Sequence, residues 1–265
     1  MNSVLKYPGA KNRIAKWIVS FIPTDHAVYL EPFAGSLAVL FNKPRCHIET
    51  VNDLHGEVVN YFRVLRDKPD YLIHAIMTTP YSREEYDNAY IHEENDSDIE
   101  RARKFCVRCW QGFGGANLYH NGFKSGQQKV SPNPAKAWSE LPNTLRLANR
   151  RLKGVQIECM DAVELIQRYN TDDVFIYCDP PYLFDKGKSY LYKYEMSEEQ
   201  HIQLLNMLKN HKGKVMISGY DNNLYNSILV GWHKEYKETR AEQGIKRMEC
   251  LWMNYEVQMS LELED

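Results

Sequence analysis

The sequence lacks any long hydrophobic run, although 43% of its 265 residues are hydrophobic. A helix that crosses a bilayer needs about 20 apolar residues in succession, and no segment has them. The first residues, MNSVLKYPGAKNR, also lack the apolar stretch of a secretory signal peptide. We therefore expect a soluble, cytoplasmic protein that does not enter a membrane.

Cysteine is scarce and scattered, with six residues in the chain. The only close pair, Cys106 and Cys109, has no second pair and no histidine pattern at the spacing of a zinc site. This excludes a zinc ribbon or finger of ordinary spacing and favours reduced, mostly buried thiols. We expect no metal site.

Charge is nearly balanced overall, at −2, but it is distributed unevenly. Residues 81–100 hold eight acids and one base, whereas residues 101–153 hold eleven bases and one acid. Most charge runs are solvated faces, but this basic segment is long and contains aromatic residues throughout. It favours contact with a nucleic acid.

Strand and helix patterns alternate in the first part of the chain. AVYLEPF (27–33) predicts a buried strand that runs into a turn of small residues, and SLAVLF (36–41) predicts the start of a helix. CHIETVND (46–53) predicts a second strand, and HGEVVNYFRVLRD (55–67) the helix behind it.

The alternation resumes after residue 150. Strands are expected in GVQIECMD, DVFIYCD and KVMISGY, and helices in AVELIQRY and SEEQHIQLLNMLKNH, the latter capped by Ser197. HKEYKETR and MECLWMNYEVQMSLEL (248–263) predict a closing antiparallel pair. We therefore expect an α/β fold with a Rossmann-like sheet, mostly parallel, with an antiparallel C-terminal strand pair.

The pattern is interrupted between these two parts. Residues 68–141 show no strand–helix alternation, and GFGGANLYHNGFKSGQQKVSPNP has the composition of a loop. We expect residues 1–67 and 142–265 to form one domain, and 68–141 to form an inserted, mainly helical subdomain.

Three acids are predicted at the carboxyl ends of strands, where open α/β sheets bind ligands. They are Glu31, Asp53 and Asp179. Gly35 in the first turn would let the backbone approach a ligand, and an acid after the second strand is placed to bind ribose hydroxyls. A nucleoside-bearing cofactor is the functional interpretation, and a purely structural turn is the alternative for each signal alone.

The segment IYCDPPY (176–182) carries the most specific chemistry. Pro180 and Pro181 would fix the Asp179 carboxylate and a backbone carbonyl as two rigid acceptors after a strand. Such acceptors orient the amine of a nucleobase for attack on an electrophilic methyl group, and Tyr182 offers a face on which the base stacks. A proline turn with a capping aspartate is the alternative.

The order of these motifs resembles the Dam-type (alpha-group) DNA adenine-N6 methyltransferases, which use S-adenosylmethionine. LKYPGAKNRIAKWI resembles the family's N-terminal cofactor motif, EPFAGSLAVLF its Phe-x-Gly motif, VNDLHGEVVNYF its ribose-binding segment and IYCDPPY its catalytic motif. VMISGYDN and ECLWMNYE resemble later strands. An insert between the Phe-x-Gly and catalytic motifs, as here, defines the alpha arrangement.

The resemblance implies a role for particular residues. Lys11 would face the cofactor's carboxylate, Asp53 would hold its ribose, and Asp161 with Ala162 would contact its adenine ring. The full cofactor set is Tyr7, Lys11, Glu31, Pro32, Phe33, Ala34, Gly35, Asp53, Asp161, Ala162 and Asp179. The catalytic set is Asp179, Pro180, Pro181 and Tyr182, and the DNA contacts would be Arg108, Trp110, Tyr119, Asn121 and Lys124.

The implied activity is site-specific methyl transfer from S-adenosyl-L-methionine to the N6 amine of a flipped adenine in duplex DNA. The resemblance further implies a Rossmann-like methyltransferase domain with a DNA-recognition insert, and a restriction endonuclease as a possible partner. Asymmetric contact with DNA and one active site per chain favour a monomer. Ser36 and Leu37 replace a second glycine of many relatives, and GFKSGQQKVS lacks the Phe-Asn-Val-Pro-Phe-Gly run of GATC-reading members. The recognition sequence is therefore open.

Other activities fit parts of this pattern. Cytosine N4 is also an exocyclic amine, although Ser-Pro-Pro-Tyr is more usual for it. Methylation of RNA or of a protein glutamine usually accompanies Asn-Pro-Pro-Tyr. A non-catalytic DNA-binding module that retains the fold is the alternative from a different class.

Overall fold

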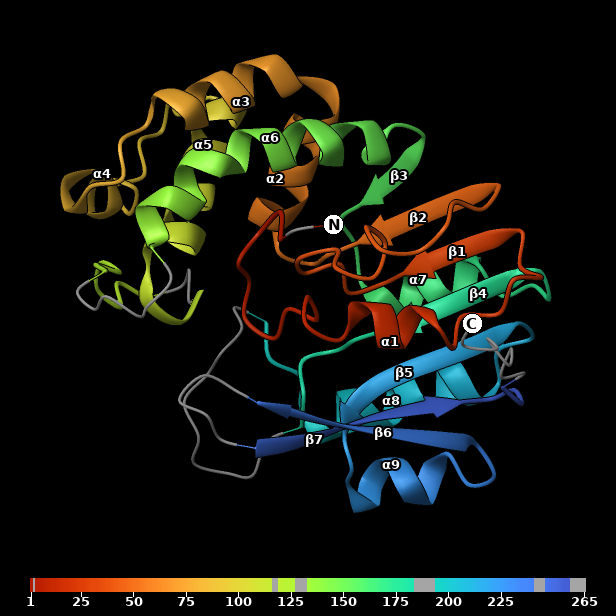
Figure 1. Cartoon of the computed structure of the whole chain (residues 1–265). Helices are drawn as coiled ribbons and strands as arrows, with labels where there is room; N and C mark the ends of the chain where they lie inside the picture. The colour runs from red at the N-terminus through yellow and green to blue at the C-terminus, as the bar shows by residue number, and fades with distance from the viewer. Residues whose placement is uncertain (2, 116–118, 127–132, 184–193, 241–245, 258–265) are drawn as a thin grey trace, which may run out of the picture.

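A seven-stranded sheet forms the centre of the protein (Figure 1). The structure, a computed structural model, describes residues 1, 3–115, 119–126, 133–183, 194–240 and 246–257. The strand order is β3 (Val155–Glu158), β2 (Ile48–Asn52), β1 (Val28–Glu31), β4 (Val174–Cys178), β5 (Lys214–Tyr220), β7 (Lys246–Met253) and β6 (His233–Arg240).

The strands from β3 to β5 are parallel, whereas β7 is antiparallel to both β5 and β6. This confirms the predicted α/β fold with an antiparallel C-terminal pair. The second strand of that pair ends at Met253. Residues 254–257, which the sequence pattern also assigned to it, are not in a strand, and residues 258–263 lie outside the described residues.

Side chains of the central strand β4 alternate between two hydrophobic clusters. Phe175 and Tyr177 pack on one side of the sheet, and Val174, Ile176 and Cys178 on the other. Successive residues of a strand point to opposite faces, so a strand buried on both sides reads as a continuous apolar run. The sheet is therefore covered on both faces.

Different helices cover the two faces (Figure 1). Helix α1 (Ala15–Val19) packs on the Phe175 side. The other side is covered by α7 (Ala162–Arg168), α8 (Glu198–Lys209) and α9 (Asn223–Ile228). Helix α8 begins with the predicted Ser197 cap, whose hydroxyl accepts from the backbone N–H of Gln200 in a capping box.

A group of helices lies beside the β3 edge of the sheet (Figure 1). Its members are α2 (Gly56–Asp67), α3 (Pro69–Thr78), α4 (Arg83–Asn88), α5 (Asp98–Gln111) and α6 (Pro134–Leu152), with a 3₁₀ turn at Phe113–Gly115. The inserted segment is thus mainly helical where it is described, and residues 116–118 and 127–132 of the expected loop lie outside the description. No helix in the described ranges is long and apolar enough to cross a membrane.

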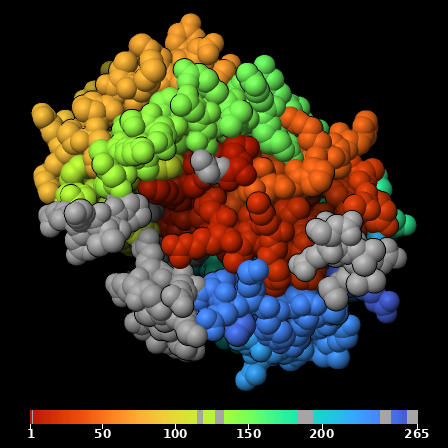
Figure 2. All heavy atoms as spheres, in the orientation of Figure 1, coloured from red at the N-terminus to blue at the C-terminus, as the bar shows by residue number. Residues whose placement is uncertain are grey.

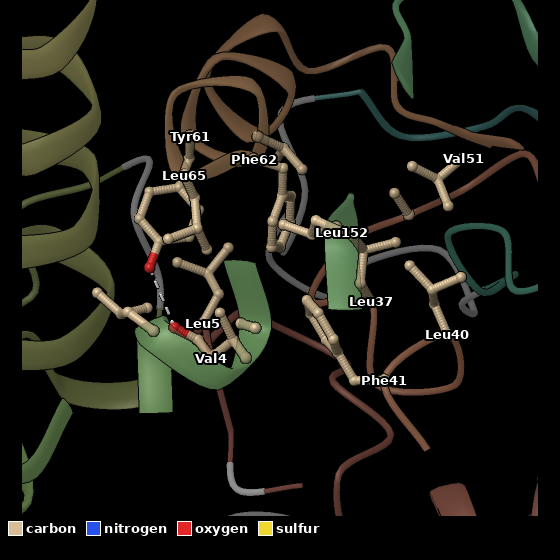
Figure 3. Close-up of a cluster of buried hydrophobic side chains, with 14 of the residues drawn as sticks. Val4, Leu5, Leu37, Leu40, Phe41, Val51, Tyr61, Phe62, Leu65 and Leu152 are labelled. Carbon is tan, nitrogen blue, oxygen red and sulfur yellow. Dashed lines mark hydrogen bonds between the residues drawn. The ribbon is translucent and has the colours of Figure 1, made fainter. Parts of the chain in front are cut away.

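Helix α6 passes through the boundary expected after Leu141. It begins at Pro134, which Asn133 caps, and ends at Leu152. Figure 3 shows Leu152 packed among core residues that include Leu37, Val51 and Phe62. The helix therefore crosses the expected boundary, and in Figure 2 its green surface borders the red and orange N-terminal segments.

Residues 36–41 differ from the prediction of a helix. They form successive turns, in which the N–H of Phe41 donates to Leu37 O and that of Lys43 to Val39 O. Leu37 has φ of +56°, in the left-handed region that side chains rarely adopt, and this interrupts a helical path. The apolar side chains of Leu37, Leu40 and Phe41 are buried all the same (Figure 3).

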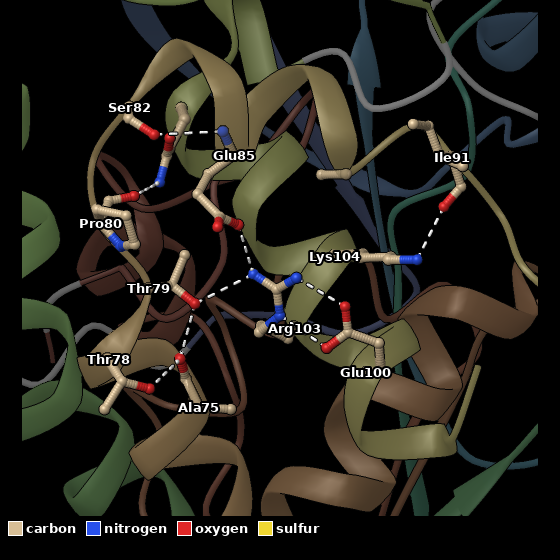
Figure 4. Close-up of polar contacts among 12 residues, drawn as sticks. Ala75, Thr78, Thr79, Pro80, Ser82, Glu85, Ile91, Glu100, Arg103 and Lys104 are labelled. Carbon is tan, nitrogen blue, oxygen red and sulfur yellow. Dashed lines mark hydrogen bonds and ion pairs between the residues drawn. The ribbon is translucent and has the colours of Figure 1, made fainter.

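Ion pairs within the helical group use much of its positive charge. The Arg103 guanidinium lies 2.9 Å from Glu85 and 2.6 Å from Glu100, and also donates to Thr79 (Figure 4). Lys104 lies 2.7 Å from Asp96. The net charge of residues 101–153 therefore overstates the charge that this segment presents to a partner.

Candidate active site

A pocket with an empty volume of about 1150 Å³, open to solvent, lies at the carboxyl ends of β1, β2 and β4. Parallel strands bring their carboxyl ends to the same edge, so residues distant in sequence meet there. Every residue predicted to hold a cofactor lines this pocket: Tyr7, Lys11, Glu31, Pro32, Phe33, Ala34, Gly35, Asp53, Asp161, Ala162 and Asp179. Their part in binding stays a prediction.

Asp53 connects the turn after β1 to the start of α2. Its Oδ2 accepts from the Gly35 N–H (2.9 Å) and its Oδ1 from the His55 N–H (2.8 Å). Gly35 has φ of +47°, and a Cβ there would lie 3.5 Å from the Tyr7 ring. Burial raises the pKa of Asp53 to about 6, so the group is mostly ionised at neutral pH. Each carboxylate oxygen has a second lone pair for a ligand hydroxyl.

Asn52, which the sequence patterns did not single out, ties three strand ends together. Its side-chain amide donates to Pro32 O (2.9 Å) and Met160 O (3.0 Å), and its Oδ1 accepts from the Met160 N–H (2.9 Å). Asp161 follows and caps α7 by accepting from two backbone N–H groups. These contacts fix the rim of the pocket beside β3.

Lys11 lies among three carboxylates on one side of the pocket. Its Nζ is 2.8 Å from Asp179 Oδ1 and 3.8 Å from Glu249 Oε1, and it also donates to a backbone carbonyl, Gly9 O. Glu31 is buried and accepts from the hydroxyl of Tyr29 (2.7 Å). Burial, together with repulsion from Asp179, raises the pKa of Glu31 to about 8. Lys11 therefore offsets the charge of Asp179 and Glu249, whereas Glu31, on which the charge of Lys43 also acts, is mostly protonated at neutral pH.

The catalytic motif lies directly after β4. Asp179 Oδ1 accepts from Ser218 Oγ of β5 (2.8 Å) as well as from Lys11. Pro181 lines the pocket, whereas Pro180 and Tyr182 do not. The sequence motif thus places a carboxylate with two donors at the edge of the pocket.

Tyr182 stands beside the pocket with 9% of its surface exposed. Its hydroxyl donates to Glu249, and its ring packs edge-on against Tyr220 at 4.7 Å between centroids. The Lys11 Nζ lies 4.6 Å from the centre of the same ring. The sequence around Ser218 and Glu249 has the pattern of a strand, and nothing in that pattern indicates these contacts.

Two predicted DNA contacts lie in the protein interior. Arg108 is 4% exposed and donates to Ala89 O, and Trp110 is 6% exposed with its indole N–H directed to Val4 O. Their side chains pack the buried face of α5, which corrects the sequence-based assignment of both. Burial also lowers the pKa of Arg108.

The other three predicted contacts are more accessible. Tyr119 and Asn121 are exposed, and Lys124 is half-buried. The backbone of this loop is attached to the helical group, since Tyr90 donates to Tyr119 O (3.0 Å) and Tyr81 to Lys124 O (2.6 Å). Contact of these three side chains with DNA stays a prediction.

A pocket of this kind, at the carboxyl ends of parallel strands and with an acid after the second strand, is typical of enzymes that bind nucleosides or nucleotides. The comparison with known protein families identifies which class of enzyme this is. The family model of D12 class N6 adenine-specific DNA methyltransferases matches residues 7–243, and the chain belongs to this family. It is thus an adenine-specific DNA methyltransferase, which confirms this part of the resemblance seen in the motifs, and the Dam-type (alpha-group) arrangement stays a prediction.

Relatives from a virus, a bacterium and an archaeon support the same assignment. The chain is 24% identical to the type II methyltransferase M.CviBI of Paramecium bursaria Chlorella virus NC1A, over 90% of each chain. It is 26% identical to M1.LlaDCHI of Lactococcus lactis subsp. cremoris, over 91% of this chain and 89% of the relative. It is also 26% identical to the type II methyltransferase M.MjaIII of Methanocaldococcus jannaschii, over 95% and 98%.

Proposed function

We propose that this protein transfers the methyl group of S-adenosyl-L-methionine to the N6 amine of an adenine that is flipped out of duplex DNA. The observation that carries the proposal is the position of Asp179. It lies directly after β4, on the edge of a pocket that all the predicted cofactor-binding residues line. Family membership supports the choice of adenine and of DNA.

The residues of the pocket fit the parts of this methyl donor. The Asp53 carboxylate would accept from the ribose hydroxyls, and the Lys11 ammonium would pair with the carboxylate of the methionine part. Gly35 leaves room for close approach, since the Tyr7 ring is the nearest group to a Cβ built there. The sulfonium of the donor supplies an electrophilic methyl group.

Asp179 would act on the nucleophile. An adenine amine has two N–H donors, and its lone pair is delocalised into the ring. A carboxylate that accepts from the amine orients it and increases the electron density on nitrogen, and it is placed to receive the proton that nitrogen loses on methylation. Ser218 donates to Oδ1 of the Asp179 carboxylate, at 2.8 Å, the same oxygen that Lys11 contacts.

Flipping a base out of a duplex costs a few kcal/mol in stacking and pairing, which the protein must offset. Tyr182 would stack on the flipped adenine and return part of this free energy. Phosphate contacts from exposed basic residues would add affinity without sequence information. The loop that holds Tyr119, Asn121 and Lys124 is the proposed reader of base edges.

The decisive experiment compares purified wild-type protein with Asp179→Ala and with the control Asp172→Ala, an exposed aspartate just before β4. DNA is incubated with S-adenosylmethionine carrying a labelled methyl group, and its nucleosides are identified by mass spectrometry. We expect N6-methyladenine from the wild type and the control, and none from Asp179→Ala, which should still bind S-adenosylmethionine in calorimetry. Turnover near the wild-type rate in Asp179→Ala would disprove the assignment.

The same assay separates the remaining alternatives. N4-methylcytosine instead of N6-methyladenine would identify cytosine as the target, and preferential labelling of RNA in a competition with DNA would identify an RNA methyltransferase. The names of the relatives support pairing with a restriction endonuclease. That partner, a monomeric state and a cytoplasmic location remain predictions.

A further inference from the structure

Glu249 is a buried acid that the catalytic motif does not include. It lies on β7 opposite Tyr220 of β5, and 4% of its surface is exposed. Its Oε1 accepts the hydroxyl hydrogen bond of Tyr182, and the Lys11 Nζ lies 3.8 Å from the same oxygen. A residue far along the chain thus contacts the last residue of the catalytic motif.

A carboxylate at this position is unfavourable for packing alone. Burial and repulsion from Asp179 both raise the pKa of Glu249, and Lys11 opposes this only in part. Replacement of a buried charged group by a well-packed apolar one is often neutral or stabilising. The contacts of Glu249 with Tyr182 and Lys11 therefore point to a role in the reaction.

Tyr182 has a ring that three neighbours orient. Tyr220 packs edge-on against it, the Lys11 ammonium lies 4.6 Å from its centre, and Glu249 holds its hydroxyl. Of these contacts, the hydrogen bond is the most directional, because its strength falls steeply as the donor angle bends. Removing it leaves the ring held by its packing against Tyr220 and Lys11.

We propose that Glu249 is a positioning residue for methyl transfer, which holds the Tyr182 ring, through its hydroxyl, in the orientation that stacks on the target base. This inference rests on the proposed function, since it concerns the binding of the flipped adenine. Glu249 acts through Tyr182 and does not touch the reacting atoms. Cofactor binding should therefore depend on it much less than base stacking does.

The test is a double-mutant cycle with Glu249→Ala, Tyr182→Phe and the double variant. Tyr182→Phe keeps the ring and removes only the hydroxyl. Glu235→Ala, on the neighbouring strand β6, is the matched control, since its carboxylate contacts His233 instead. Two duplexes carry the site that the wild type modifies. One has 2-aminopurine at the target position, and its fluorescence reports base flipping. The other has adenine there and is used for single-turnover methylation.

We expect Glu249→Ala to slow single-turnover methylation about 10- to 100-fold, which is the effect of losing one hydrogen bond to a charged group. The dissociation constant of the cofactor should change less than about threefold. Tyr182→Phe should show a similar loss, and the double variant should be no slower than the slower single variant. The 2-aminopurine fluorescence change should decrease in the same variants and stay unchanged in Glu235→Ala.

The proposal would be overturned if the fold-decrease in methylation rate of the double variant equalled the product of the two single decreases. That result would show that Glu249 acts independently of the Tyr182 hydroxyl. Wild-type methylation and fluorescence in Tyr182→Phe would also overturn the proposal, because this variant keeps the ring and lacks only the hydroxyl that Glu249 holds. Glu249→Gln keeps a hydrogen-bond acceptor and should recover most of the activity; no recovery in a folded Gln variant would also count against it. If the wild type itself methylates no adenine, the proposed function fails instead.

Discussion

Replacement of Lys11 by methionine tests the electrostatic balance of the pocket. Methionine keeps an unbranched side chain but removes the ammonium that lies 2.8 Å from Asp179 and 3.8 Å from Glu249. The Lys11 and Glu249 side chains are 8% and 6% exposed, and that of Asp179 is 19% exposed. Removing one partner of a buried pair costs about 3–5 kcal/mol, and the partial exposure of Asp179 favours a loss of about 3 kcal/mol.

This loss should depend on pH. Without Lys11, the pKa of Glu249 should rise further, because burial already raises it and the charge of Lys11 opposes that rise. A carboxyl group with a raised folded-state pKa loses its proton on unfolding. The free energy of unfolding of the variant therefore falls as pH increases from the unfolded-state value of about 4 towards the raised folded-state pKa.

Urea unfolding of the wild type and Lys11→Met at about pH 5 and about pH 8 measures this difference. The loss of stability should be larger at the higher pH, and Lys16→Met, on the exposed side of α1, should show little loss at either pH. Calorimetry should also show weaker binding of S-adenosylmethionine to Lys11→Met. An equal loss of stability at both pH values would refute the electrostatic explanation.

Three further outcomes follow from individual contacts. Affinity for S-adenosylmethionine should increase as pH rises through about 6, because the pKa of Asp53 is raised to about 6 and the ionised carboxylate is the better acceptor. In calorimetry, Asp53→Asn should bind S-adenosylmethionine weakly, and its affinity should not depend on pH in this range. Ser218→Ala should lower kcat about tenfold, because Asp179 loses a hydrogen bond, and an unchanged kcat would argue against that contact. Arg103→Met should lower the free energy of unfolding by about 1–2 kcal/mol in urea titrations, since Glu100 and Glu85 lose their partner; a smaller effect than about 0.5 kcal/mol would contradict it.

Most of the sheet could be predicted because its strands have continuous apolar runs that end in turn residues. The chemistry at the carboxyl ends could also be predicted, since parallel strands must bring Glu31, Asp53 and Asp179 to one edge. The turns at residues 36–41 could not be predicted, because the spacing of apolar residues does not reveal the positive φ of Leu37.

Residues that depend on tertiary packing were the ones that sequence patterns missed or misassigned. Arg108 lies in a basic, aromatic segment, yet the buried face of α5 includes it, and its charge gives no sign of this. Ser218 and Glu249 reach the catalytic motif only because β5 and β7 pair beside it. Their side chains look like ordinary strand residues in the sequence.

We propose that this chain methylates adenine at a specific DNA site through Asp179. Single-molecule sequencing of plasmid DNA from a methylation-deficient bacterial host that expresses the protein tests it most directly, with Asp179→Ala expressed in parallel. We predict N6-methyladenine at one short sequence motif, and its absence with the variant. Unmodified plasmid DNA from cells that contain folded wild-type protein able to bind S-adenosylmethionine would contradict the claim.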